Sequence, residues 1–149
     1  MMKFAGMNVD EETPYIPTAA CGHSKACGIL FSVGLNERIF HKYIILSLAL
    51  NPGEVQTELA RNTDPEWLKR AIKKREELGI MLWKTPTQGA STTLVAATDS
   101  SLGPPTSDGR RYYLDNCQPG QGPAHATDKA DAETLWQISE ELTGHKFSF

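Results

Sequence analysis

The sequence predicts an α/β fold, on three observations. Apolar residues with helical spacing alternate along the chain with continuous apolar runs of strand length. The predicted elements follow in the order helix, strand, helix, helix, strand, helix, which is typical of α/β chains with parallel strand pairing. The chain has 149 residues, enough for one domain at most with a single hydrophobic core.

A loop, a long helix and a buried strand are predicted for the first third of the chain. Residues 1–20 are rich in polar and turn-forming residues, so we expect a loop there. From about Gly22 to Phe40, apolar residues recur near the 3.6-residue period of a helix. Tyr43 to Leu50 is a continuous apolar run, as in a parallel strand that is buried on both faces. Asn51-Pro52-Gly53 ends this run, because proline and glycine interrupt regular structure.

Three further helices and one short strand are predicted after this turn. Thr63–Glu66 and Thr85–Gln88 each have the capping-box pattern of a helix start. The predicted helices span about 63–78, 85–97 and 129–142, a strand spans 111–114, and a loop spans 118–123. Two strands alone cannot bury an apolar run on both of its faces, so the predicted parallel sheet is incomplete.

Composition argues against several classes of function. A net charge of −3 gives no electrostatic basis for binding nucleic acid. The longest apolar stretch, Ile44 to Leu50, is too short to span a membrane, and the acidic N-terminal segment is a poor signal peptide. Cys21, Cys27 and Cys117 are odd in number and lack metal-ligand spacing, which suits free thiols in a reducing compartment. We therefore predict a cytoplasmic protein without a metal site.

Two short motifs carry the strongest functional signal. The first is Cys21-Gly22-His23-Ser24-Lys25, at the start of the predicted first helix. The second is Asn51-Pro52-Gly53-Glu54-Val55-Gln56-Thr57, which begins 26 residues after Lys25 and follows the predicted strand. Together they resemble the signature of the short-chain dehydrogenase/reductase family, Tyr-x-x-x-Lys followed by Pro-Gly-x-Val-x-Thr. The resemblance continues through residues 85–90 and 109–117 and so covers nearly the whole chain.

The resemblance implies an NAD(P)-dependent oxidoreductase that acts on a small or lipophilic alcohol or ketone. In the family, the tyrosine hydroxyl exchanges a proton with the substrate. The lysine one helical turn later lowers the pKa of that hydroxyl and binds the nicotinamide ribose. Lys25 holds the lysine position, which makes it a predicted catalytic and cofactor-binding residue. NADP is the commoner cofactor among relatives of this type, and NAD is the alternative.

The second motif is predicted to bind the nicotinamide end of the same cofactor. Pro52 and Gly53 would turn the backbone at the carboxyl end of a strand, where open α/β sheets bind ligands. By resemblance, the backbone of Val55 would meet the nicotinamide carboxamide, and Thr57 would contact the cofactor phosphates. The sequence thus predicts a cofactor-binding turn over residues 52–57.

Cys21 stands where the family has its catalytic tyrosine. Its sulfur is one carbon from the backbone, well short of the reach of a tyrosine hydroxyl, so we expect Cys21 to be non-functional as the proton donor. A thiolate beside Lys25 would be a different kind of reagent. A thiol-based activity at Cys21 therefore stays open as a third and weaker alternative.

The N-terminal, nucleotide-binding half of the family domain is predicted to be absent from residues 1–149. The sequence has no glycine-rich turn between a strand and a helix, and Gly120-Gln121-Gly122 lacks the third glycine of that pattern. The family's catalytic serine would precede Met1. We therefore interpret the chain as a partial domain, the C-terminal part of a Rossmann-type doubly wound parallel sheet, and expect weak or no cofactor binding.

Two functions of different classes follow from these observations. The first is an oxidoreductase of the short-chain family, present here as a truncated and impaired copy. The alternative is a non-catalytic remnant that acts by associating with an intact relative or with a second copy of itself. The helix predicted at 22–40 would contribute to either association, since the corresponding helix packs in dimer interfaces of the family.

Overall fold

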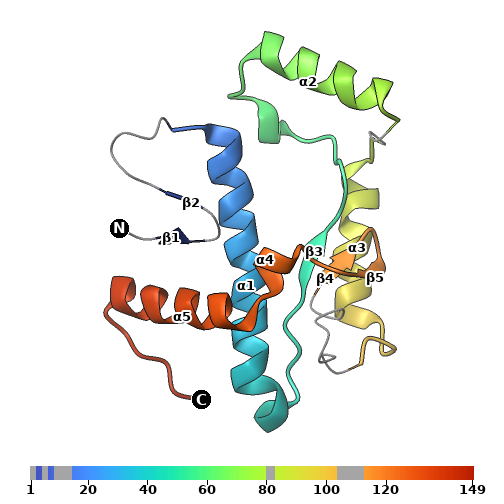
Figure 1. Ribbon diagram of the computed structural model, residues 1–149. Helices are drawn as coiled ribbons and strands as arrows, with labels where there is room; N and C mark the ends of the chain where they lie inside the picture. The colour runs from blue at the N-terminus through green and yellow to red at the C-terminus, as the bar shows by residue number, and fades with distance from the viewer. Residues whose placement is uncertain (1–2, 5–6, 9–14, 80–82, 104–112) are drawn as a thin grey trace. The chain divides into compact units, whose positions relative to one another are not determined.

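The computed structural model describes residues 3–4, 7–8, 15–79, 83–103 and 113–149, which form a mixed α/β structure (Figure 1). The chain divides into two compact units. The first unit comprises Met1–Ala49, Ser101–Leu114 and Pro119–Phe149, and the second comprises Leu50–Ser100 and Asp115–Gln118. None of the helices in the described part of the chain is long and apolar enough to cross a membrane.

A long first helix, α1, spans Pro17–Tyr43 and extends the predicted helix at both ends. Proline is tolerated in the first turn, where its missing N–H would have no helical partner, so Pro17 begins the helix instead of excluding it. The helix ends at Ile44, whose φ of 56° is left-handed and whose N–H donates to the carbonyl of Phe40 at 2.8 Å. The loop predicted over residues 1–20 is therefore wrong from Pro17 onward.

The predicted strand over Tyr43–Leu50 is also wrong, except for its last two residues. The observed strand β3 spans only Ala49–Asn51, and Ile44 and Ile45 are 75% and 55% exposed. The continuous apolar run misled the prediction, because such a run has no periodicity that separates a strand from a helix end. The first residue of the run, Tyr43, belongs to the last turn of α1.

A small mixed sheet has the strand order β3-β4-β5. Strand β4 spans Tyr113–Asp115 and overlaps the strand predicted at 111–114, whose first two residues lie outside the described residues. Strand β5 spans Gln118–Gly120, where a loop was expected. Asn116 and Cys117, with φ of 49° and 68°, make the two-residue turn between β4 and β5, as both central residues of a type I′ hairpin turn require.

Four other helices and a short antiparallel pair complete the described elements. The pair is β1, Lys3–Phe4, with β2, Met7–Asn8, in a segment predicted as loop. The helices are α2, Pro65–Glu77, α3, Pro86–Thr98, α4, Ala124–Thr127, and α5, Lys129–Thr143, with a 3₁₀ helix at Glu58–Ala60. The three helices predicted after residue 60 are thus confirmed to within two residues at each end.

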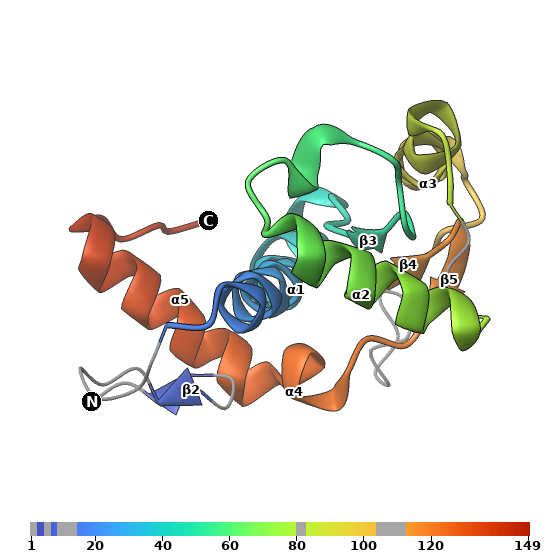
Figure 2. The ribbon, with the colours of Figure 1, turned by 90° about the horizontal axis from the view of Figure 1, so that it is seen from above.

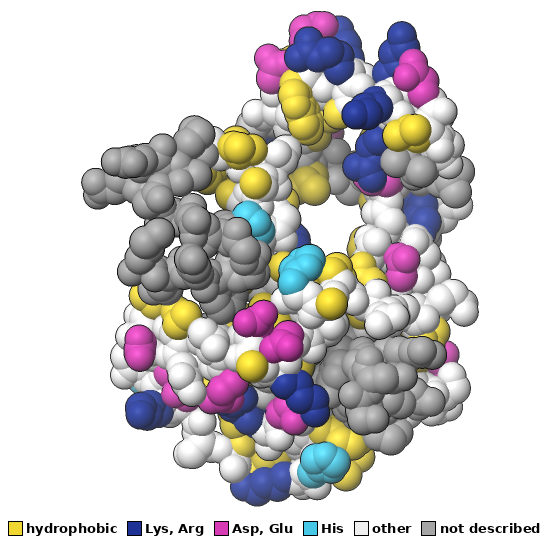
Figure 3. Space-filling view, viewed as in Figure 1, with side chains coloured by type: hydrophobic (Ala, Val, Ile, Leu, Met, Phe, Trp, Pro, Cys, Tyr) yellow, Lys and Arg dark blue, Asp and Glu magenta, His cyan; other side chains and the backbone are white. Residues whose placement is uncertain are grey.

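The helix caps explain these boundaries. The Thr85 hydroxyl accepts from the N–H of Gln88 at 3.2 Å, and the Gln88 side chain accepts from the N–H of Thr85 at 2.9 Å, which is a complete capping box. At the start of α2 the capping box predicted at Thr63–Glu66 is wrong, because the cap is Asp64, which accepts from the N–H of Trp67 at 2.6 Å. Gly144 ends α5 with a φ of 69°. Figure 3 shows Lys, Arg, Asp and Glu side chains interleaved over α2, which buries none of its residues.

The core of the first unit lies where α5 lies across α1 (Figures 1 and 2). Leu30 and Val33 of α1 pack with Ala132 of α5, and all three are buried. The ring of Trp136 stacks on Phe31 with the centroids 5.6 Å apart, and the Arg38 guanidinium lies 4.1 Å from the Trp136 centroid. Aliphatic and aromatic contacts therefore join the two helices.

A buried asparagine holds the chain that leaves α1. Asn36 is 2% exposed and lies within the helix. Its side-chain amide donates to the carbonyl of Ser47 at 2.7 Å and accepts from the N–H of Ser47 at 2.8 Å. Both main-chain groups of Ser47 are thereby satisfied away from any sheet, which fixes the path of residues 44–48.

Replacing Asn36 with leucine is expected to destabilise the chain by about 1–3 kcal/mol, because the two polar groups of Ser47 lose their partner. Urea unfolding followed by circular dichroism measures the change. His41→Leu, on the exposed face of the same helix, is the control and is expected to stay within about 0.5 kcal/mol of the parent. Equal effects of the two substitutions would contradict this role of Asn36.

Purified on its own, the chain is expected to self-associate. Large apolar side chains are exposed just outside both ends of α1 and at and after the end of α5, among them Tyr15, Ile16, Ile44, Leu142 and Phe147. Light scattering coupled to size exclusion measures the mass, and Ile44→Lys combined with Ile16→Lys is expected to reduce it. A monodisperse monomer with cooperative unfolding would contradict the expectation.

Candidate functional site

The predicted cofactor-binding turn lies in the second unit and is built around Gly53. Gly53 has a φ of 82°, which side chains rarely adopt, and its N–H donates to the Asn51 side chain at 3.0 Å. A Cβ at residue 53 would lie 2.6 Å from the Asn116 side-chain oxygen and 3.1 Å from Lys84 Nζ. Both the backbone conformation and the space therefore require glycine at this position.

The residues after Gly53 pair with the segment that leads into α3. The N–H of Gln56 donates to the carbonyl of Lys84 at 2.9 Å, and the N–H of Lys84 donates to the carbonyl of Glu54 at 2.9 Å. This is a parallel bridge between Val55 and Lys84. In this pattern the N–H and C=O of Val55 point away from Lys84, toward the opposite side of the segment. The N–H and C=O of Val55 are therefore oriented to hydrogen-bond a partner on that opposite side.

The Val55 side chain packs against the first turns of α3. A Cβ at Gly89 would lie 2.5 Å from one methyl of Val55 and 3.0 Å from the other. Gly89 is buried. Only a residue without a side chain lets α3 approach Val55 this closely, so Gly89 helps to fix the orientation of Val55.

A polar network closes the turn from the other side. Lys84 Nζ donates to the carbonyl of Pro52 at 2.8 Å and to the side-chain oxygen of Asn116. The amides of Asn51 and Asn116 both donate to one carboxylate oxygen of Asp115, at 3.0 and 2.9 Å. The residues that follow β3 are thereby tied to those that follow β4.

Thr57 caps the 3₁₀ helix that follows the turn. Its side-chain oxygen accepts from the N–H of Leu59 at 3.3 Å, and the residue is exposed. Glu54, two residues before Gln56, pairs with Arg75 of α2. The residues predicted to bind the cofactor, from Pro52 to Thr57, form one continuous segment of the second unit, half-buried up to Val55 and exposed after it.

Cys21 and Lys25 lie on α1, in the first unit. They are one helical turn apart and both are exposed, so they share a face of the helix as the motif spacing predicts. Ser24 donates to the carbonyl of Cys21 at 2.8 Å. Burial raises the pKa of the nearby Cys27 thiol, which keeps that sulfur protonated at neutral pH. In the described part of the chain no three His, Cys, Asp or Glu residues are grouped as metal ligands would be.

Comparison with known proteins gives matches among curated sequences only. No protein-family model matches the chain, and no solved structure matches it. A "Probable oxidoreductase" of Streptomyces lividans is 37% identical over 142 residues, which are 86% of this chain and 46% of that protein. A short-chain dehydrogenase/reductase of Penicillium roqueforti is 32% identical over 151 residues, 91% of this chain and 41% of that protein. Retinol dehydrogenase 12 of Mus musculus is 30% identical over 137 residues, 87% of this chain and 38% of that protein.

The chain belongs to the short-chain dehydrogenase/reductase family. It spans less than half the length of each of these three relatives. The family resemblance inferred from the two motifs is therefore confirmed. The roles assigned to Lys25, to Cys21 and to the turn at 52–57 stay predictions.

No sequence motif assigns a role to Lys84, Gly89 or Asn116 of this short-chain dehydrogenase/reductase chain. Residues 85–90 and 109–117 belong to the family resemblance as whole segments, without a role for any single residue. Lys84 could have been singled out by its position directly before the capping box of α3, which fixes the backbone there. Its contact with Pro52 joins residues 32 positions apart and has no local pattern.

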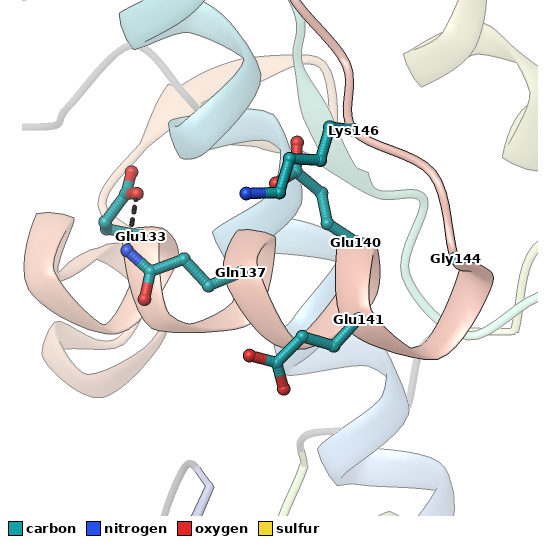
Figure 4. Close-up of a pocket in the computed structure, with 6 residues that line it drawn as sticks. All are labelled: Glu133, Gln137, Glu140, Glu141, Gly144 and Lys146. Carbon is teal, nitrogen blue, oxygen red and sulfur yellow. Dashed lines mark hydrogen bonds between the residues drawn. The ribbon is translucent and has the colours of Figure 1, made fainter.

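The first unit has a surface depression. It is lined by residues of α5 and of the segment that follows, namely Glu133, Gln137, Glu140, Glu141, Gly144 and Lys146 (Figure 4). The N–H of Phe147 donates to the Glu140 carboxylate at 3.0 Å and, with the indole N–H of Trp136, holds its pKa below the ordinary range. The carboxylate thereby attaches the C-terminal residues to α5.

Gly89→Ala is expected to destabilise the protein by about 1–3 kcal/mol, since the added methyl overlaps both methyls of Val55. Denaturant unfolding checks the loss. Gly28→Ala is the matched control, because this helix glycine has nothing within 4 Å of an added Cβ and is expected to gain about 0.5–1 kcal/mol. Stabilisation by both substitutions would contradict the close approach of α3 to Val55.

Proposed function

We propose that residues 1–149 form the C-terminal part of a Rossmann-type short-chain dehydrogenase/reductase domain that binds the nicotinamide end of NADP or NAD. The intact domain would interconvert an alcohol and a carbonyl compound. The observation that carries the proposal is the turn at Gly53 followed by Val55, whose main-chain N–H and C=O point away from its bridge to Lys84. The names of the relatives support the reaction class, since one is a retinol dehydrogenase.

The residues present fit a nicotinamide cofactor at its nicotinamide end. The missing Cβ of Gly53 makes room for the Asn116 side-chain oxygen and for Lys84, which hold the turn that leads to Val55. Val55 would hold the carboxamide through its N–H and C=O, Lys25 would hold the ribose hydroxyls, and Thr57 would face the phosphates. A bound nicotinamide supplies the hydride acceptor or donor.

Proton transfer is the step for which this chain is poorly equipped. In the family, the lysine lowers the pKa of the tyrosine hydroxyl one helical turn earlier, and Lys25 shares a face of α1 with position 21. Cys21 offers a thiol whose sulfur lies closer to the helix than the oxygen of a tyrosine would. We therefore propose that the turn and Lys25 are retained, while the proton donor at position 21 is lost.

A second candidate function is association without catalysis. It is favoured by the exposed apolar side chains at both ends of α1, together with Cys21 at the proton-donor position. In this case the chain would act by packing against an intact relative or a second copy of itself. The cytoplasm would be the compartment, as the free thiols suggest.

The test is a fusion of residues 1–149 to the N-terminal half of an intact relative, with Cys21→Tyr. We expect this fusion to oxidise alcohols or reduce ketones with NADP or NAD, and Lys25→Ala to lower its kcat by about 10²-fold or more. The unfused chain is expected to show no activity and only weak cofactor binding, with or without Cys21→Tyr, because groups that act as a unit are not additive.

Three results would be decisive against this view. A fusion that folds but stays inactive with Cys21→Tyr would contradict the oxidoreductase assignment and favour the non-catalytic candidate. Micromolar binding of NADPH to the unfused chain, measured by calorimetry, would contradict the partial site. Turnover by the unmodified chain that Cys21→Ser abolishes would establish the thiol chemistry instead.

A further inference from the structure

We propose that Lys84 is a positioning residue that holds the turn at Pro52–Val55 in the conformation the cofactor site needs. The proposal rests on the proposed function for the purpose of this turn. Lys84 belongs to neither family motif, and it lies 32 residues beyond Pro52 in the sequence. It contacts the turn with its main chain and with its side chain.

The main chain of Lys84 is hydrogen-bonded to the residues on either side of Val55. It accepts from the N–H of Gln56 and donates to the carbonyl of Glu54, both at 2.9 Å. The next residue, Thr85, begins the capping box of α3, which fixes the backbone that follows. The Cα of Lys84 is therefore immobilised, so that its side chain has to order only its own rotamers to reach the turn.

The side chain of Lys84 joins two chain segments that follow neighbouring strands. Its ammonium donates to the carbonyl of Pro52 and to the side-chain oxygen of Asn116. An ammonium has three donors and no acceptor, so it bridges two oxygens that would otherwise only repel each other. The N–H of Asn116 in turn donates to the carbonyl of Asn51 at 2.9 Å. The ammonium thus closes a ring of contacts at the carboxyl ends of β3 and β4.

Gly53 shows how closely this ammonium approaches the turn. The space where a Cβ of residue 53 would lie is occupied by the Asn116 oxygen, by Lys84 Nζ at 3.1 Å and by Lys84 Cε at 3.3 Å. Glycine and lysine are therefore complementary here. The left-handed glycine turn makes room for the ammonium, and the ammonium holds the carbonyl before that glycine.

The first experiment measures amide hydrogen exchange by NMR on the whole chain and on Lys84→Met. We expect exchange at Gly53, Gln56 and Asn116 to rise at least tenfold, with the amides of α5 unchanged. Lys69→Met removes an exposed lysine of the same unit and is expected to change these amides less than twofold. Lys84→Arg is expected to restore part of the protection. Unchanged exchange at the turn in Lys84→Met, or an equal rise over the whole chain, would overturn the proposal.

The second experiment tests the consequence for ligand binding. Reduced nicotinamide mononucleotide at millimolar concentration is expected to shift the amide resonances of Val55 and Gln56 in the parent and in Lys69→Met, and to shift them at least fivefold less in Lys84→Met. Equal shifts in Lys84→Met and the parent would overturn the positioning role. If the parent shows no shift, the proposed function fails, and the exchange experiment alone decides whether Lys84 holds the turn.

Discussion

The parallel pairing of residues 54–56 with Lys84 is the interaction on which the rest of the second unit depends. Two main-chain hydrogen bonds of 2.9 Å fix the direction in which the chain leaves Gly53. The same pairing sets the start of α3, because the capping box begins at the residue after Lys84. It also brings Gly89 against Val55. This short bridge therefore determines the conformation of the turn, the start of α3 and the packing of α3 against Val55.

The backbone restricts which residue can be accommodated at three positions of the second unit, namely Gly53, Gly89 and the turn at Asn116. At Gly53 the backbone must be left-handed, and at Gly89 a neighbouring side chain takes the place of a Cβ. At Asn116 and Cys117 the hairpin turn needs two positive φ angles, and residues other than glycine supply them. Positions where the backbone packs closely are therefore concentrated around the segment that carries the family signature. Close approach of chain to chain is what gives this segment a defined shape.

The helices and the signature turn could be predicted from the sequence because their causes are local. The capping box of α3 needs only Thr85 and Gln88, and the turn at Pro52–Gly53 follows from the conformations of proline and glycine. The strand predicted over 43–50 was wrong because the main-chain groups of Ser47 are hydrogen-bonded to Asn36, a residue outside the apolar run. Strand β5 was missed because Pro119 argues against a strand unless it lies at the edge of a sheet, as it does here. The role of Lys84 could not be predicted for the same reason, since it contacts residues that are distant from it in the sequence.

The segment between α1 and β3 is constrained in length more than in sequence. Ile44 accepts a left-handed conformation that costs a side-chain-bearing residue about 1–2 kcal/mol, and Asn36 holds Ser47, 11 residues further on, with both atoms of its amide. Ile44 and Ile45 themselves face solvent. Evolution is therefore free to exchange the exposed side chains of this connection, but an insertion or deletion between residues 36 and 47 would shift the partner of the asparagine. Homologous chains with an asparagine at this position are expected to vary in the composition of the connection and to conserve its number of residues.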